Sequence, residues 1–402
     1  MVKKILIGVG ALAALLAIAA GGLFFKASST LNSPVEAPLP PIAAATDAQS
    51  IERGRHIFMN VCANCHMQDS QGRVAGGQMK DLPEVFGPIY SANLTTHPTA
   101  GIASMKDEEI ARAVRYGVRR DGRRIVIMPV LGMSDEDLAA VIGFMRSGDP
   151  VFAADERAQP HPRLSLVGTL ALGMSFAPVA SHPASGLKAP PKGPTPEYGR
   201  YLAFEVYGCA ECHSPGVAQD RHHKPEAFSG GFEFPTPAGT IFSTNITFHE
   251  SGLGKWNLAQ FTRALRDGVN PEGYVLRDPM IRVRGLDDAD AEAMYRFLQT
   301  LPKLAAQPLP ESAAPRAKAS AQAAPEQLFA QLGCVSCHAE GAKFRAMLKR
   351  SVSKPTVEVA QWIRNPEAVV PGTQMPTYAE LIDESQSMSL AAWVQQQAVH
   401  IP

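Results

Sequence analysis

Six cysteines stand in three pairs, and each pair is followed directly by a histidine in the pattern Cys-x-x-Cys-His. In such a segment two thiols can form thioether bonds to the vinyl groups of one haem, and the adjacent imidazole can supply an axial ligand to the iron. The three segments use every cysteine of the chain, so the sequence predicts three covalently attached haem c groups. The attachment residues are Cys62, Cys65 and His66, then Cys209, Cys212 and His213, then Cys334, Cys337 and His338.

Two other kinds of site use paired cysteines, namely a zinc knuckle and a thioredoxin-like redox pair. One isolated segment would leave both open. Three copies, each closed by a histidine, in a chain with an export signal favour haem. A thioredoxin-like pair would also need a strand, turn and helix around it, and the sequence does not predict them.

A haem that carries electrons needs a sixth ligand, and a methionine thioether is soft and stabilises ferrous iron. Downstream of each histidine one methionine stands beside a proline: Met128, Met280 and Met375. In the second segment the proline precedes the methionine, whereas in the other two it follows. Met133 is a nearby competitor of Met128, and we assign Met145, Met294 and Met388 to helix packing.

Six arginines gather after the first haem segment, which allows two interpretations. They can form a solvated helix end that pairs with haem propionates, or a docking face for an acidic partner. We favour the first. The six are Arg112, Arg115, Arg119, Arg120, Arg123 and Arg124.

The N-terminus carries an export signal. Lys3 and Lys4 precede an apolar run from Ile5 to Phe25, which exceeds the ~20 residues that a bilayer span needs. We favour an uncleaved membrane anchor over a removed signal peptide. The leading lysines place the N-terminus in the cytoplasm and predict an inner-membrane protein with periplasmic haem domains. The formal net charge of zero argues against a nucleic-acid partner.

Proline-rich stretches divide the rest of the 402-residue chain into units. Within the linker 151–194 we interpret an apolar stretch, Leu164 to Ala180, as packed over a haem domain, although its length reaches the lower limit for a membrane span. The predicted parts are 1–26 (signal or anchor), 27–48 (tether), 49–150 (unit one), 151–194 (linker), 195–302 (unit two), 303–323 (linker) and 324–402 (unit three).

Units one and two are repeats of each other. In both, a Gly-Arg pair precedes the cysteines, an Asn-x-Thr turn follows them, and two helices frame the methionine. Ser134 and Asp137 resemble a capping box at the start of one such helix. Because no segment shows convincing strand alternation, we predict a mainly α fold with three cytochrome c-type domains in tandem. The matched features are Gly54-Arg55 and Gly199-Arg200, Asn93 to Thr95 and Asn245 to Thr247, helices 107–117 and 257–268, and helices 134–145 and 287–298.

These stretches resemble the multihaem cytochrome c subunits of bacterial membrane-bound dehydrogenases. That family includes the three-haem subunits of alcohol, gluconate and sorbitol dehydrogenases and relatives that serve molybdenum hydroxylases. The position of Trp256 is taken by Met105 in unit one, and the family's C-terminal membrane-attachment segment is not evident. The segments that carry the resemblance are 245–247, 252–256 and 261–269 in unit two, 113–118 and 128–130 in unit one, and 362–366 and 371–376 in unit three.

The resemblance implies an electron-transfer subunit rather than a catalytic enzyme. It would take electrons from a dehydrogenase catalytic subunit and deliver them to a respiratory acceptor, which is quinone, a soluble cytochrome or an oxidase. The alternative is a haem enzyme, such as a peroxidase or a thiosulfate-oxidising cytochrome. That function needs one haem without a methionine ligand, whereas each unit here has a candidate methionine.

Overall fold

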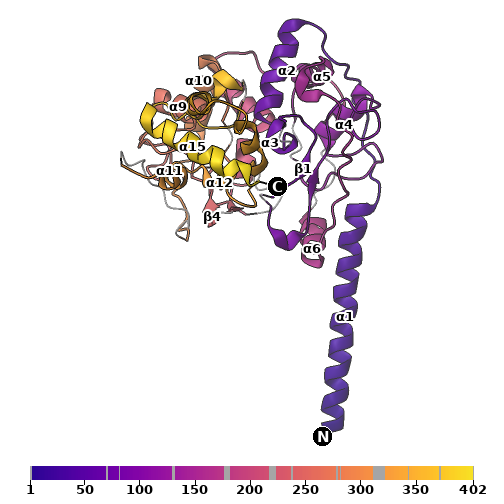
Figure 1. Cartoon of the computed structure of the whole chain (residues 1–402). Coiled ribbons are helices and arrows are strands. Elements are labelled where there is room, and N and C mark those ends of the chain that lie inside the picture. Colours follow the sequence, from indigo (N-terminus) through magenta and orange to yellow (C-terminus); the bar gives the residue numbers. More distant parts are fainter. Residues whose placement is uncertain are drawn as a thin grey trace.

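The computed structural model describes residues 2–68, 71–80, 82–128, 132–175, 182–216, 223–236, 239–277, 279–280, 282–310, 322–342, 344–370 and 373–401. One long helix, α1 (Val2–Asn32), projects from a body made of short helices and loops (Figure 1). Within the described residues, α1 is long and apolar enough to cross a membrane. The mainly α prediction is confirmed, although two small antiparallel sheets were not foreseen.

Unit one is built around the packing of two helices, α2 and α5. Asp47 caps the first of them and Ser134 the second, each through a side-chain oxygen that accepts a backbone N–H. Its elements are α2 (Ala48–Asn60), α3 (Ala63–His66), β1 (Gly77–Gln78), η1 (Glu84–Phe86), β2 (Tyr90–Ser91), α4 (Asp107–Tyr116), α5 (Asp135–Arg146) and η2 (Pro150–Phe152).

Unit two repeats this arrangement with α7 packed on α10. Each helix that precedes the cysteines crosses its partner at a glycine. A Cβ on Gly54 would lie 1.9 Å from the carbonyl oxygen of Ala140, and one on Gly199 would lie 1.9 Å from that of Ala293. The elements are α7 (Pro196–Tyr201), the π-helical η3 (Leu202–Val206), α8 (Cys209–His213), β3 (Glu233–Thr236), β4 (Gly239–Phe242), α9 (Leu258–Asp267) and α10 (Asp288–Thr300).

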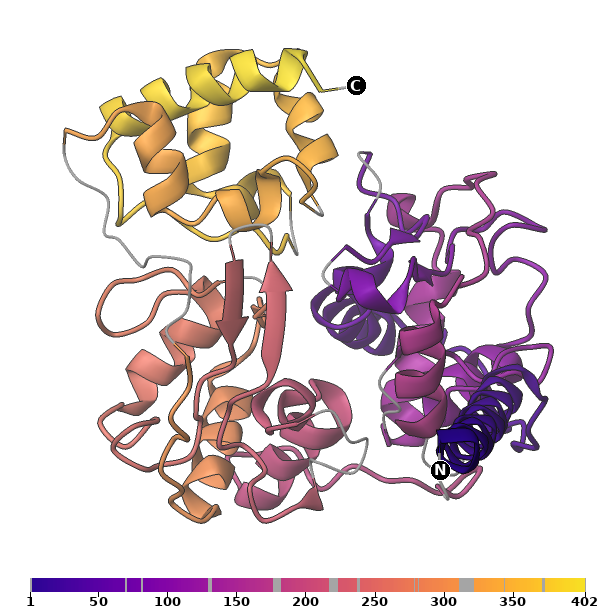
Figure 2. The same ribbon diagram turned by 90° about the horizontal axis from the view of Figure 1, so that it is seen from below.

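Unit three has its own cluster of buried side chains, whereas the buried side chains of units one and two form one continuous cluster. Figure 2 shows the unit-three helices as a separate group beside unit two. The elements are α11 (Pro325–Gln331), α12 (Val335–His338), η5 (Arg345–Ser351), α13 (Thr356–Arg364), α14 (Pro366–Val369) and α15 (Glu384–Val399).

The segment predicted as a tether is held against unit one. Its first residues continue α1, and Ile42 farther on is buried. The backbone N–H of Ala45 donates to the carbonyl of Ala139 over 2.9 Å, and that of Ala44 donates to the Asp107 carboxylate over 2.9 Å. These contacts fix the end of α1 relative to unit one.

The interface between units one and two contains charged and polar side chains. Asp137 accepts from Arg53 over 2.9 Å and from the Tyr201 hydroxyl over 2.6 Å. The expected return bond of a capping box is therefore absent at this residue, because its carboxylate binds Arg53 of the same unit and Tyr201 of unit two instead. Nearby, Nε2 of His56 lies 3.0 Å from the hydroxyl of Tyr207.

The first prediction concerns this histidine. Burial, reinforced by the charge of Arg53, lowers the pKa of His56 from 6.5 to about 4. Between these values the unfolded chain binds a proton that the folded chain does not, so the free energy of unfolding falls as the pH falls. We expect a loss of about 2–3 kcal/mol between pH 7 and pH 4 from this group. Urea unfolding of wild type and His56→Gln at both pH values isolates its contribution, and identical pH slopes would contradict the prediction.

Candidate haem sites

Each Cys-x-x-Cys-His segment forms a short helix. In units one and three the backbone N–H of the histidine donates to the carbonyl of the first cysteine, over 3.0 Å for His66 and 2.9 Å for His338. Residues three and four apart lie on one side of a helix, so each pair of thiols and its imidazole can address one porphyrin. The three helices are α3, α8 and α12.

The three imidazoles are oriented in the same way, by a backbone carbonyl that lies close to Nδ1. The distances are 2.8 Å from His66 to Ala92, 2.7 Å from His213 to Thr244 and 2.9 Å from His338 to Phe344. A carbonyl oxygen only accepts, so Nδ1 carries the proton and Nε2 keeps its lone pair. This is the tautomer that an iron ligand needs.

The Asn-x-Thr turns explain where two of these carbonyls come from, since Ala92 and Thr244 each directly precede the asparagine. The Asn93 side-chain oxygen accepts from the N–H of Thr95 over 2.8 Å, and Asn245 makes the same bond over 2.9 Å. Sequence reasoning identified the turns but not the carbonyls. The residue before each repeated Asn-x-Thr was the signal that could have found them.

Burial affects the thiol of the first cysteine of each pair. It raises the pKa of the Cys62, Cys209 and Cys334 thiols to about 12. Burial also lowers the pKa of two of the imidazoles, to about 4 for His338 and below its usual value for His213. Both imidazoles therefore stay neutral. Apolar surroundings, neutral thiols and a ligating nitrogen fit a covalently attached haem.

The three methionines predicted as sixth ligands are half-buried, whereas most of the other methionines considered are buried in the core. Met128, Met280 and Met375 are neither core residues nor fully exposed. In contrast, Met133 is 1% exposed and Met294 is 2% exposed, which makes both of them core residues. Met145, predicted to pack inside its helix, is also buried.

The assignment of Met388 to packing was wrong. Its side chain is 39% exposed on α15. The helix buries other positions instead, among them Leu390 and Val394. Pro129, which supported the assignment of Met128, lies outside the described residues, and so do Pro371 and Gly372 of the unit-three segment that carries the resemblance.

The methionine loops of units two and three meet the end of α2 at one junction. The Asn60 side chain is buried, accepts from the N–H of Arg284 over 2.9 Å and donates to its carbonyl over 3.1 Å. The side-chain oxygen of Gln374 accepts from the N–H of Arg282 over 3.1 Å, and the Arg284 guanidinium donates to the carbonyl of Met375. The three candidate haem sites are therefore mechanically connected.

The six arginines do not form a single solvated surface. Arg115 is completely buried and donates to the carbonyls of Ala184 and Met133, each over 2.9 Å. It is therefore a structural residue of unit one. Four others, Arg119, Arg120, Arg123 and Arg124, lie in or beside the loop after α4, next to the end of α1, because the N–H of Val35 donates to the carbonyl of Gly122 over 2.9 Å.

Comparison with known proteins shows which family part of the chain matches and which proteins the chain resembles. Residues 51–149 match the cytochrome c family. The chain is 28% identical to the fructose dehydrogenase cytochrome subunit of Gluconobacter japonicus over 66% of its length and 55% of the relative's. It is 28% identical to the gluconate 2-dehydrogenase cytochrome c subunit of Pantoea cypripedii, over 78% of the chain and 75% of the relative.

A further relative is the cytochrome c subunit of the quinone-dependent alcohol dehydrogenase of Gluconacetobacter polyoxogenes, with 28% identity over 65% of the chain and 58% of the relative. The chain thus spans little more than half the length of two of these three proteins. The expected resemblance to dehydrogenase cytochrome subunits is confirmed. The chain therefore carries a cytochrome c domain, the type that binds haem c covalently, and is related to the cytochrome subunits of bacterial dehydrogenases.

Proposed function

We propose that this chain is a three-haem electron-transfer subunit, which accepts electrons singly from a dehydrogenase catalytic subunit and passes them to a respiratory acceptor. The observation that carries the proposal is the same arrangement in three places: two thiols on one helical turn and an imidazole whose Nδ1 is held by a carbonyl. The names of the relatives support a dehydrogenase as the electron donor.

In this proposal the protein holds the haems and the haem irons change oxidation state. The cysteine pairs would hold each porphyrin, and His66, His213 and His338 would supply the proximal ligands. Met128, Met280 and Met375 would supply the sixth ligands, which keep small molecules from the iron and favour the ferrous state. The junction at Asn60 and Arg284 would keep the sites in fixed positions relative to one another.

We also propose that α1 anchors the chain in the inner membrane, with the three units on the periplasmic side. The apolar part of α1 is exposed along its length, which is costly in water and favourable in a bilayer. The lysines that precede this part support a cytoplasmic N-terminus.

The experiment that tests the function counts the haems. A pyridine haemochrome assay on the purified chain should give about three haems per polypeptide, because all three segments have the attachment geometry. Replacing both cysteines of any one segment by alanine should remove one haem and leave about two.

Two results would contradict this proposal. One is a wild-type count of two or fewer. The other is binding of carbon monoxide by one ferrous haem of the intact protein, which would indicate an open coordination position and favour the haem-enzyme alternative.

A further inference from the structure

The surface around the end of α1 has features that electron transfer does not use. From Leu6 to Phe25 the helix is apolar and exposed, and Phe25 itself is 75% exposed. At Lys26 its composition changes, and the last turns carry serine, threonine and asparagine. If α1 spans the membrane, as proposed above, the boundary of the hydrocarbon layer lies near Lys26.

The apolar helix α6 (Leu166–Ser175) packs against α1 at this level. A Cβ on Gly173 would lie 2.4 Å from the carbonyl oxygen of Ala27, so the two backbones are in direct contact just beyond the boundary. At Gly168, α6 is equally close to the carbonyl of Phe86 in η1, which joins it to unit one. Figures 1 and 2 show α6 beside α1 at the end of the body from which α1 projects.

The outer side of α6 is apolar and uncovered. Leu166 is 63% exposed, Val167 48% and Met174 48%, and Val85 of the adjoining η1 is 53% exposed. No charged residue occurs between Leu166 and Ser175. Ten residues of helix measure about 15 Å, half the thickness of the hydrocarbon layer, so α6 is too short to cross a bilayer. It is, however, placed to contact the bilayer surface.

A basic loop lies at the same end of α1. The turn from Val118 to Arg124 contains four arginines and one aspartate. The carbonyl of Gly122 in this turn accepts from the backbone N–H of Val35, a residue just beyond the end of α1, over 2.9 Å. The Arg120 side chain is 58% exposed, although it also pairs with Glu109 over 3.0 Å. Positive charge is therefore concentrated where phospholipid headgroups would lie.

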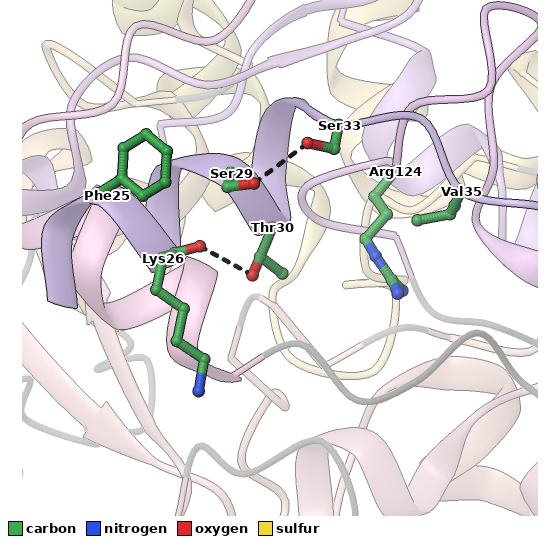
Figure 3. Close-up of a pocket in the computed structure, with 7 residues that line it drawn as sticks. All are labelled: Phe25, Lys26, Ser29, Thr30, Ser33, Val35 and Arg124. Carbon is green, nitrogen blue, oxygen red and sulfur yellow. Dashed lines mark hydrogen bonds between the residues drawn. The ribbon is translucent and has the colours of Figure 1, made fainter. Parts of the chain in front are cut away.

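A pocket joins the helix end to this loop (Figure 3). Phe25 supplies an apolar wall at the membrane side, while Lys26 and Arg124 supply positive charge. Hydroxyl groups complete it: that of Thr30 donates to the Lys26 carbonyl over 3.0 Å, and those of Ser29 and Ser33 are hydrogen-bonded to each other over 3.2 Å. A hydrocarbon wall, two cations and several hydroxyls suit the phosphate and first glycerol carbons of a phospholipid. The lining residues are Phe25, Lys26, Ser29, Thr30, Ser33, Val35 and Arg124.

We propose that unit one rests on the bilayer through a membrane-facing surface formed by α6, Val85, the loop 118–124 and this pocket. The occupant is the membrane itself: α6 lies in the interfacial layer, and the pocket binds the headgroup of an anionic phospholipid. The inference rests on the proposed anchoring by α1. It means that unit one, which carries the first haem site, is held against the membrane surface and does not swing on a free tether.

The first test labels the intact holoprotein in vesicles of phosphatidylcholine and phosphatidylglycerol with a lipid-soluble carbene reagent, followed by peptide mass spectrometry. Labelling is expected in α1 and also at Leu166, Val167 and Met174. Val352 and Val357 in unit three are as exposed as these, at 45% and 51%, and serve as matched controls that should stay unlabelled.

The possible results distinguish failure of the membrane-facing surface from failure of the proposed anchoring by α1. Labelled α1 with unlabelled α6 would overturn the inference and leave the anchor intact. A purified chain that begins after α1 and carries no label would overturn both the membrane-facing surface and the anchor. The haem count would still test the proposed electron transfer. Label at α6 equal to that at Val352 and Val357 would show exposure to the reagent in water and would also overturn the inference.

The second test concerns the pocket. Lys26→Gln should reduce the enrichment of phosphatidylglycerol over phosphatidylcholine among retained lipids by roughly fivefold, the usual effect of one cation at a membrane surface. Lys255→Gln removes an exposed lysine from unit two and should leave the enrichment unchanged. Equal lipid retention in wild type and Lys26→Gln, with α1 still labelled, would overturn the headgroup assignment.

Discussion

Replacing Gly199 by alanine should destabilise unit two by about 3 kcal/mol. The added Cβ would lie 1.9 Å from the carbonyl oxygen of Ala293 and 2.3 Å from its carbon, far inside van der Waals contact. The neighbour is backbone in the middle of α10, so α7 and α10 must move apart and lose packing along their whole contact. Urea unfolding followed by circular dichroism measures the loss. Gly54→Ala should have the same effect in unit one, where the carbonyl of Ala140 is equally close.

The matched control is Gly193→Ala. This glycine has no atom within 4 Å of an added Cβ and no positive φ angle. The substitution should be neutral, or slightly stabilising because it restricts the unfolded chain. If Gly199→Ala unfolds at the same urea concentration as Gly193→Ala, the close helix crossing does not contribute to stability.

These glycines show what the sequence could and could not predict. The repeated Gly-Arg pairs are visible in the sequence, but the reason for the glycine lies in a helix far along the chain. Local signals were more informative. The predicted helices end at Gly117 and Gly268, whose φ angles of 62° and 70° glycine adopts without strain. The helix that ends at Gly268 begins at the side-chain cap Asn257, and α10 begins in the same way at Asp287.

The candidate haem sites, too, could be predicted from the sequence only where their features are local. Cysteine spacing predicted each candidate attachment segment because the chemistry of such a segment is local. The carbonyls of Ala92 and Thr244, which orient two of the imidazoles, lie 26 and 31 residues beyond their histidines. That of Phe344 lies only 6 residues beyond His338, but no Asn-x-Thr turn marks it. The shared core of units one and two was equally hidden, since it depends on how two repeats dock. Met388 was misassigned because helical spacing alone does not say which face is buried.

Replacing Met280 by alanine should lower the reduction potential of one haem while leaving that haem attached. The thioether would be lost, but Cys209, Cys212 and His213 would remain. Ferrous iron would lose its soft ligand, so the ferric state would be favoured. If three haems contribute equally, the weak near-infrared band of ferric His/Met haem should fall by about one third. Spectroelectrochemical titration and the near-infrared spectrum measure the two effects.

The structure supplies a demanding control for this prediction. Met294 belongs to the same unit but is 2% exposed within the core, and its α10 packs on α7. Met294→Ala should therefore keep the whole band and cost about 2–5 kcal/mol of folding free energy, because it leaves a cavity. Met280 is half-buried at the edge of the core, so its replacement should cost less stability. Loss of the band in Met294→Ala but not in Met280→Ala would show that the repeat between units one and two does not extend to the ligand.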